Sequence, residues 1–445
     1  MIRFFSQKLY DWASDRRFSE IFAGSVWAVA ARALSGGLAL LFSILVARYY
    51  GAEAVGIVGV ISSLVMFAAI FALLGTNISA LRLIPEHMAN HSATSALRVY
   101  RKILGMVAGL SLLAAVVIFA GADILAVKVF SKPHLGVFFS LAALFVVARA
   151  LMELNTNALR GLKHIRAFAF MQLLPHLFAL LLLLVMIRLA VGAGGPVYAL
   201  LASWLITGLA GILIIVWIFA QKRIDGDAVK DVPLKRIMTL SLPMFMANAA
   251  GLFIGQVGVL MLGMFRDEAE VGYYFIALKL ATLTGFALKA VNTMASPRFA
   301  ELYHSGKTQE LFHIARKSTR LIFWTSAPVL LFLILLGYPF LRVAFGDVFV
   351  AAYPALVLLA LGKFASAISG STGAFMSMTG HQSVFQNIMI VTLGLNIAMN
   401  LLFIPPLGIL GAALSAMLSQ AFWNFSVLLF IKKKFGRSIG YFPFL

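Results

Sequence analysis

The stretch LGVFFSLAALFVVARALMELNTNA, residues 135–158, decides the class of this protein. It is apolar and long enough to cross a bilayer as a helix, yet it carries Arg149, Glu153 and Asn157. Their spacing of i, i+4 and i+8 places the three side chains on one helix face. A cation near the bilayer centre costs about 2.5–3.5 kcal/mol, so such residues normally face a water-filled cavity or a partner. The stretch therefore predicts a membrane helix with a functional polar face.

The composition of the whole chain indicates the same class. Of 445 residues, 62% are hydrophobic and 12% are charged, against roughly 25% charged in soluble proteins. We expect an all-α polytopic membrane protein with twelve transmembrane helices in two pseudo-symmetric six-helix bundles. The apolar runs lie near residues 22–47, 55–80, 103–122, 135–158, 167–190, 196–219, 238–265, 272–296, 319–341, 353–378, 386–404 and 409–430.

The net charge of +20 follows the expected membrane topology. If both termini are cytoplasmic, 25 of the 36 Lys and Arg residues lie in cytoplasmic segments and 6 in the opposite loops. This is the positive-inside asymmetry, and it predicts the orientation. Basic clusters such as Arg98, Arg101 and Lys102 are then topology signals and contacts to anionic membrane lipids. No nucleic-acid partner is expected.

Away from their ends, the predicted spans contain five basic residues and a single acidic residue, Glu153. The bases are Arg32, Arg149, Lys279, Lys289 and Lys363. One carboxylate cannot neutralise five cations, so the expected partner of the others is an anionic substrate. We predict that four of them project into a central hydrated cleft between the two bundles, namely Arg32, Arg149, Lys279 and Lys363. Lys289 is a weaker candidate for substrate binding.

Each of these residues also has a structural interpretation. Arg149 and Glu153 can form an ion pair that holds helices together, with Glu153 orienting the arginine or coupling an ion. Lys289 is close enough to the predicted cytoplasmic end to extend its ammonium out of the bilayer. The Asn and Gln pairs of the later spans can be interhelical hydrogen bonds. The bases that lie deeper without an acid on the same helix are Arg32, Lys279 and Lys363.

An internal repeat at an offset of 215 or 216 residues organises the chain. EAVG at 53–56 matches EAEVG at 268–272, and RK at 101–102 matches RK at 316–317. Two six-helix halves enter the membrane from the same side, so the repeats are parallel and related by an axis along the membrane normal. The offset brings Arg149 beside Lys363 and Arg32 onto Asn248. Asn248 therefore joins the substrate-binding candidates.

The repeat predicts the division of the chain. The expected parts are an amphipathic N-terminal segment on the membrane surface, two six-helix lobes joined by a cytoplasmic linker, and a basic cytoplasmic tail. In chain order, the N-terminal segment comprises residues 1–20, the first lobe 21–220, the linker 221–236, the second lobe 237–431 and the tail 432–445. In the seventh span, Gly251 and Gly255 follow Pro243, which predicts a hinge. Helix packing at small residues is the alternative.

No enzymatic activity, cofactor or metal is expected. The triplet Gly306–Thr308 resembles the end of a phosphate-binding loop, but Glu301 occupies the place of the required earlier glycine. His87 and His91 are four apart, yet Met88 stands where a zinc protease has its glutamate. The absence of cysteine excludes disulfides and thiolate metal sites.

Several weak motifs in a consistent order resemble one family of transporters. They are RYYG at 48–51, LSLP at 240–243, AEVGYY at 269–274, PRFAEL at 297–302 and IPPLGILGAA at 404–413. The pattern resembles the polysaccharide transporter branch of the multidrug/oligosaccharidyl-lipid/polysaccharide (MOP) exporter superfamily, from the first span to the last. It is similar to Wzx flippases and more distantly to the lipid II flippase MurJ.

This resemblance implies a V-shaped pair of bundles that alternates between inward-open and outward-open states. It implies a flippase that moves undecaprenyl-pyrophosphate-linked oligosaccharide repeat units to the periplasmic leaflet of the bacterial inner membrane, for O-antigen or exopolysaccharide. The lipid-linked oligosaccharide is then the substrate, and a polysaccharide polymerase or chain-length regulator is a further expected partner.

Two other functions stay open at this stage. A multidrug antiporter of the same superfamily captures organic cations with intramembrane carboxylates, and Glu153 is the only candidate for that role. A non-transporting membrane subunit of a polysaccharide synthesis complex is the second alternative.

Overall fold

The computed structural model describes residues 16–221 and 232–441 of the chain. Within these ranges, the side chains of residues 16–29, 243–244 and 246–248 are not described. The expected roles of Pro243 in the hinge and of Asn248 in substrate binding therefore lie outside the described residues. The same holds for most of the expected N-terminal segment and linker. Over the described ranges the chain is α-helical and contains no strand.

The first half of the chain folds into seven α-helices. They are α2 (Arg16–Leu73), α3 (Thr76–Asn90), α4 (Ala93–Ala120), α5 (Ala122–Ile124), α6 (Gly136–Gly161), α7 (Ile165–Arg188) and α8 (Gly195–Ala220). Between α5 and α6 lie a π-helical turn, Leu125–Val129, and a 3-10 turn, Pro133–Leu135. Helix α2 contains the first predicted span and residues 55–73 of the second, and Gly51, with a φ of 82°, breaks the helical backbone between them. A φ in the left-handed region favours glycine.

The second half contains nine α-helices. They are α9 (Leu234–Phe265), α10 (Glu268–Leu283), α11 (Gly285–His304), α12 (Thr308–Leu335), α13 (Gly337–Phe345), α14 (Tyr353–Ser369), α15 (Thr372–Met378), α16 (Gln382–Leu407) and α17 (Ile409–Phe435). A 3-10 segment, Asp347–Ala352, lies between α13 and α14. The side chain of Asp267 caps α10 by accepting the N–H of Glu270 at 2.8 Å. Two acidic residues in the first turn of α10 also suit the positive end of the helix dipole.

The described helices confirm a polytopic membrane fold. Nine of them are long and apolar enough to cross a membrane, and ten if α10 and α11 count as one bent span. The expected number of twelve stays a prediction. One expected span, 272–296, is not a single helix, because the chain breaks between α10 and α11 with a bend of 40°. A second expected span, 353–378, is interrupted between α14 and α15, where Gly370 has a φ of 69°.

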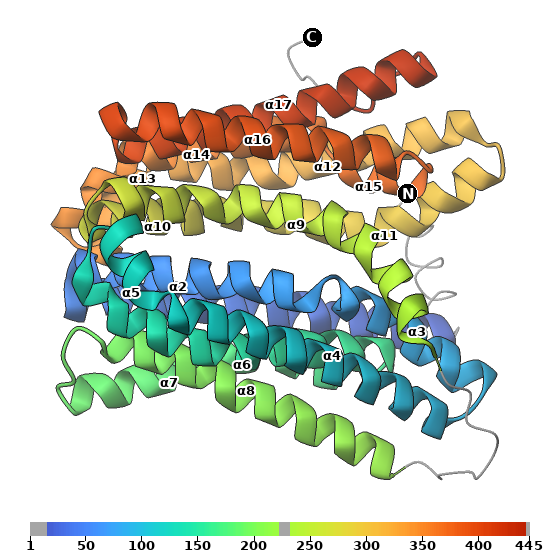
Figure 1. Cartoon of the computed structure of the whole chain (residues 1–445). Helices are drawn as coiled ribbons and strands as arrows, with labels where there is room; N and C mark the ends of the chain where they lie inside the picture. The colour runs from blue at the N-terminus through green and yellow to red at the C-terminus, as the bar shows by residue number, and fades with distance from the viewer. Residues whose placement is uncertain (1–15, 222–231, 442–445) are drawn as a thin grey trace.

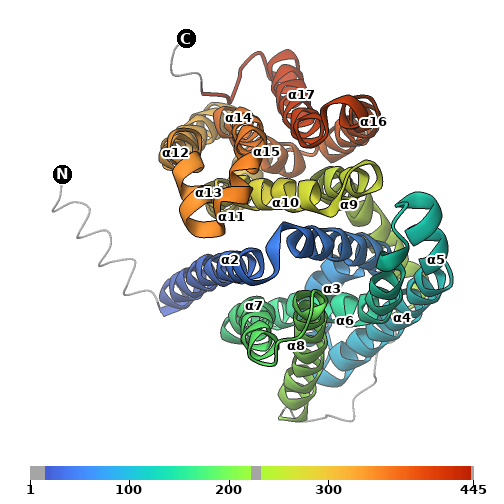
Figure 2. The ribbon, with the colours of Figure 1, turned by 90° about the vertical axis from the view of Figure 1, so that its left-hand side faces the viewer.

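The two halves form two groups of helices that lie side by side. Figure 1 shows α5 and α13 at one end of the molecule and α3 at the other. Seen from the α5 and α13 end, helices α2–α8 form one group and α9–α17 the other, with α2 and α10 between them (Figure 2). The largest buried apolar cluster extends across both groups, from Phe42 on α2 to Ala413 on α17.

The repeated motifs lie against each other where the two groups meet. A Cβ atom added to Gly56 would overlap the carbonyl oxygen of Glu268, and one added to Gly272 would overlap the carbonyl oxygen of Ala52. The offset of 216 relates Ala52 to Glu268 and Gly56 to Gly272, so the contact is reciprocal. Reciprocal contacts are the signature of a two-fold axis. The glycines allow the backbones of α2 and α10 to approach closely here.

Polar contacts join the two groups at the α5 and α13 end. Glu268 Oε1 forms an ion pair with Lys132 Nζ at 3.4 Å and lies 2.9 Å from His134 Nε2. Arg48 donates hydrogen bonds to the carbonyl oxygens of Val343 and Ala344 in the opposite group. These contacts hold that end of the interface closed in this structure.

The C-terminal residues pack against the second group. The three lysines at 432–434, expected in the tail, form the last turn of α17, where positive charge suits the helix dipole. After α17 the chain folds back, and the N–H of Tyr441 donates to the carbonyl oxygen of Ile368 at 2.8 Å. Ile439 is fully buried. The described part of the expected tail is therefore an integral part of the fold.

Candidate functional site

The polar face predicted on residues 135–158 lies on α6, as the helical spacing requires. Arg149 Nη1 and Glu153 Oε2 form an ion pair at 3.0 Å. Asn157 Nδ2 donates to Glu153 Oε1 at 3.3 Å and to the Glu153 carbonyl oxygen at 2.9 Å. The neighbouring stripe, Val146 with Ala150, is fully buried. Burial of the apolar stripe turns the polar stripe out of the helix packing of its own group.

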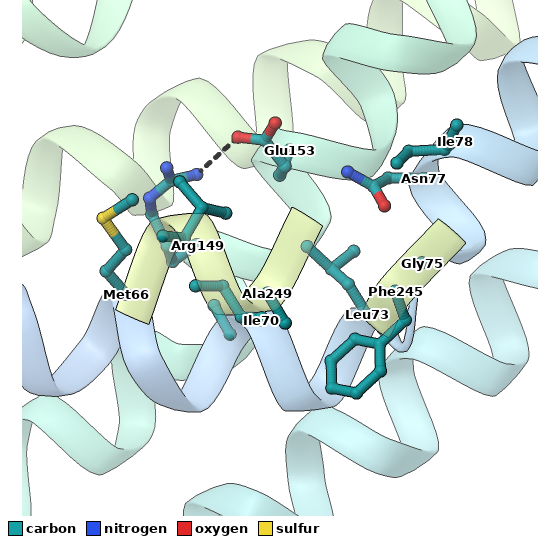
Figure 3. Close-up of a pocket in the computed structure, with 12 residues that line it drawn as sticks. Met66, Ile70, Leu73, Gly75, Asn77, Ile78, Arg149, Glu153, Phe245 and Ala249 are labelled. Atoms are coloured by element: carbon teal, nitrogen blue, oxygen red, sulfur yellow. Dashed lines mark hydrogen bonds and ion pairs between the residues drawn. The ribbon is translucent and has the colours of Figure 1, made fainter. Parts of the chain in front are cut away.

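The ion pair lines a cavity between the two groups of helices. The cavity has a volume of ≈140 Å³ and is bounded by α2, α3 and α6 of the first half and by α9 of the second. Figure 3 shows Arg149 and Glu153 on one wall, with Ile70 and Ala249 facing them across the space. Most of the other lining side chains are apolar, such as Phe245. Arg149 is the strongest hydrogen-bond donor available to a polar group inside this cavity.

The sequence analysis missed Asn77, which also lines this cavity. Asn77 lies in the predicted span 55–80. A polar side chain within a predicted span was the signal that could have found it, whereas Asn248 was selected through the repeat offset. The cavity therefore contains a cation, a carboxylate and an amide on otherwise apolar walls.

Lys279 lies at the interface between α10 and α2. Its ammonium donates to the carbonyl oxygen of Ala39 at 2.9 Å and to Ser43 Oγ at 2.6 Å. It also lies 5.6 Å from the ring centroid of Phe275, a cation–π contact. All of these partners are uncharged. Lys279 is therefore satisfied in hydrogen bonds while its positive charge is not neutralised.

Lys363 belongs to a polar network within the second group. Its Nζ atom lies 3.4 Å from Gln420 Oε1. Gln420 and Asn424 on α17 both donate to Ser366 Oγ on α14, at 2.6 Å and 3.0 Å. The network contains no carboxylate, so it orients the ammonium without neutralising it.

The remaining two cations are exposed. Arg32 on α2 and Lys289 on α11 come from different halves, and their positive charges repel each other. Lys289 is also repelled by Lys363. Among the described residues, no acidic side chain forms an ion pair with any of these three cations. Together they create a positive field shared by the two halves.

The predicted cations lie near two different titratable side chains. Arg149 and Lys279 both act electrostatically on His176 of α7, and Arg32 and Lys363 both act on Lys289. The common cleft predicted for Arg32, Arg149, Lys279 and Lys363 stays a prediction, because only Arg149 lines the cavity described above.

The predicted hinge lies in α9, which is a continuous helix over Leu234–Phe265. A Cβ added to Gly251 would meet only Met389 Cε, at 3.4 Å, and one added to Gly255 would meet nothing within 4 Å. Close packing against another helix therefore does not account for Gly255. The hinge stays a prediction.

The chain matches a known protein family over most of its length. The model of a family described as polysaccharide biosynthesis protein matches residues 45–354. The chain belongs to this family. The resemblance found in the sequence motifs, to polysaccharide transporters of the MOP superfamily, is confirmed, and the chain is a multi-pass membrane protein.

One curated relative of the chain is distant in sequence. The probable low-salt glycan biosynthesis flippase Agl15 of Haloferax volcanii is 21% identical over 175 residues. That match covers 39% of this chain and 37% of the relative.

Two solved structures share its fold. The lipid II flippase MurJ in an inward closed conformation is similar with a TM-score of 0.67 and 14% identity, over 92% of this chain and 87% of that chain. The MATE multidrug transporter DinF-BH is similar with a TM-score of 0.65 and 14% identity, over 95% of this chain and 96% of that chain.

Proposed function

We propose that the protein is a flippase that moves undecaprenyl-pyrophosphate-linked oligosaccharide repeat units from the cytoplasmic to the periplasmic leaflet. One observation carries this proposal: the cations Arg32, Lys279, Lys289 and Lys363 have no ion-pair partner among the described residues. A pyrophosphate is an anion that would complement such a field. The family match and the glycan flippase relative support a glycan-linked lipid as substrate.

Arg149 is the proposed first ligand of the pyrophosphate. It lines the cavity between the halves, and Glu153 holds its guanidinium at 3.0 Å. The guanidinium has five N–H donors, so the ion pair leaves enough donors for a two-pronged contact with a phosphate. Lys279 and Lys363 are proposed as further ligands, because each ammonium is oriented by neutral oxygens.

Alternating access is the proposed mechanism, with both termini in the cytoplasm of a bacterium and the protein in its inner membrane. Opening toward the periplasm would separate Glu268 from Lys132 and His134, and Arg48 from α13. Moving two negative charges outward along a 100 mV inside-negative potential would release roughly 4.6 kcal/mol. No covalent step is needed, so the protein is proposed not to be an enzyme. A polymerase or chain-length regulator is proposed as the partner that receives the product.

A multidrug antiporter is the second candidate, because transporters of that kind share the fold. Such a function needs a carboxylate that is free to bind an organic cation. Glu153 is the only acid in the predicted spans, and it is bound to Arg149 in this structure. The pairing of Glu153 with Arg149, together with the excess of bases over acids in the predicted spans, therefore favours an anionic substrate.

Reconstitution into liposomes tests the proposal. The purified protein is incorporated with undecaprenyl-pyrophosphate oligosaccharide that carries a fluorescent label on the sugar, and an inside-negative potential is imposed with a potassium gradient and valinomycin. We expect protein-dependent movement of the label between leaflets, measured by its accessibility to a membrane-impermeant quencher. Export of a cationic dye without lipid movement would establish the antiporter instead. Absence of both activities would favour the non-transporting subunit.

A further inference from the structure

A second cavity lies between α3 and the start of α9. Its volume is ≈420 Å³, and its lining includes Arg82, Lys235 and Arg236. It is distinct from the cavity at Arg149, although α3 and α9 contribute to both. Between the two cavities, Ser79 Oγ and Ser241 Oγ form a fully buried hydrogen bond of 2.7 Å. That contact closes the interface, so the second cavity is a separate site in this structure.

The second cavity is strongly basic. Arg236 Nη2 forms an ion pair with Glu86 Oε1 at 2.7 Å, while Arg82 and Lys235 have no acidic partner among the described residues. The first turn of α9 contains no acidic residue, so the positive end of the helix dipole adds to the field. Lys102 of α4 is also nearby, because its Nζ donates to the carbonyl oxygen of Val232 at 3.1 Å.

The cavity lies at the level expected for lipid headgroups. Arg82 follows the predicted span 55–80, and Lys235 and Arg236 precede the predicted span 238–265. Farther along α9, inside the predicted span, Leu242 is 49% exposed. Large exposed apolar side chains on a transmembrane helix contact acyl chains, whereas bases just outside the spans face phosphates. The charge asymmetry predicts that this end of the molecule is cytoplasmic.

We propose that this cavity binds the phosphate of an anionic phospholipid, with Arg82, Lys235 and Arg236 as its ligands. Basic pockets between transmembrane helices on the cytoplasmic side bind anionic headgroups of this kind. The closed contact between Ser79 and Ser241 separates the cavity from Arg149, which favours a resident lipid over the transported one. Because the ligands come from both halves, the bound phosphate would join α3 to α9 and stabilise this closed interface.

Native mass spectrometry of the full-length protein tests this proposal, with phosphatidylglycerol as the probe. The protein is released from nanodiscs of phosphatidylcholine and phosphatidylglycerol, and the retained phosphatidylglycerol is titrated. We expect wild type to retain it and the triple variant Arg82→Gln/Lys235→Gln/Arg236→Gln to bind it about fivefold more weakly for each base removed. The single variant Lys235→Gln, at an exposed residue, tests the site if the triple variant does not fold.

The matched control is Lys432→Gln/Lys433→Gln/Lys434→Gln, which removes the same charge from the last turn of α17. It should retain phosphatidylglycerol as wild type does. Equal weakening in the control would overturn the proposal, because it would show general surface attraction. Wild-type binding by both Lys235→Gln and the triple variant would overturn it too. Displacement of phosphatidylglycerol by added undecaprenyl pyrophosphate would assign the cavity to the transported lipid.

Discussion

Replacing Arg149 by glutamine tests the proposed substrate site most directly. In the structure, Arg149 Nη1 uses one donor for Glu153 Oε2 at 3.0 Å, which leaves donors for two hydrogen bonds to a phosphate. A hydrogen bond to a charged group contributes about 1.5–3 kcal/mol. Loss of two such bonds costs at least about 3 kcal/mol, or roughly 150-fold in transport at low substrate concentration. We therefore expect Arg149→Gln to abolish measurable transport, and the same for Lys363→Gln.

The conservative exchanges distinguish geometry from charge. Arg149→Lys should be much more damaging than Lys363→Arg, because an ammonium is a point charge and cannot reproduce the planar fork of a guanidinium. The double variant Arg149→Gln/Glu153→Gln is the control for repulsion between an unpaired Glu153 and the pyrophosphate. If this repulsion causes the defect, the double variant should regain transport. If the lost ligand causes it, the double variant should stay inactive.

The assay is complementation of a strain that lacks its own flippase, with surface polysaccharide as readout and membrane expression measured for each variant. Arg188→Gln, at an exposed residue at the end of α7, removes one positive charge away from the cavity and should behave as wild type. Full activity in both Arg149→Gln and Lys363→Gln would refute the reasoning. The pyrophosphate would then be held elsewhere, with Arg32 and Lys279 as the next candidates.

Three further outcomes are expected. Glu153→Gln should impair complementation without abolishing it, because the guanidinium loses its orienting partner but keeps its charge; wild-type activity would exclude the orienting role. Gly56→Ala places a Cβ against the carbonyl oxygen of Glu268, so it should loosen the contact between α2 and α10. A cysteine introduced at the buried residue Ala54 should then react faster with a membrane-impermeant maleimide than the same cysteine in the control Gly37→Ala, whose Cβ meets nothing within 4 Å. Equal rates would contradict the reciprocal contact. A Cβ at position 255 meets nothing within 4 Å, so Gly255→Leu should insert normally and slow transport, and normal transport by a well-expressed variant would remove the hinge hypothesis.

The membrane class and the polar face of α6 followed from the sequence because both depend on local properties. Hydropathy belongs to each residue and its neighbours, and an apolar run long enough to span a bilayer has few alternatives to a helix. The pairing of Arg149 with Glu153 is equally local, because residues four apart are neighbours on any α-helix. The structure confirms that pair at 3.0 Å.

The partners of the other cations were decided by the tertiary structure. Lys279 donates to Ser43, which is 236 residues away in the chain, and no local pattern specifies that contact. The repeat in the sequence related Gly56 to Gly272, but only helix packing brought each glycine against the other repeat. Asn77 entered the cavity for the same reason. Within a membrane, bundle-facing and lipid-facing residues are similarly apolar, so hydropathy locates a helix while the packing of helices decides which side chains meet.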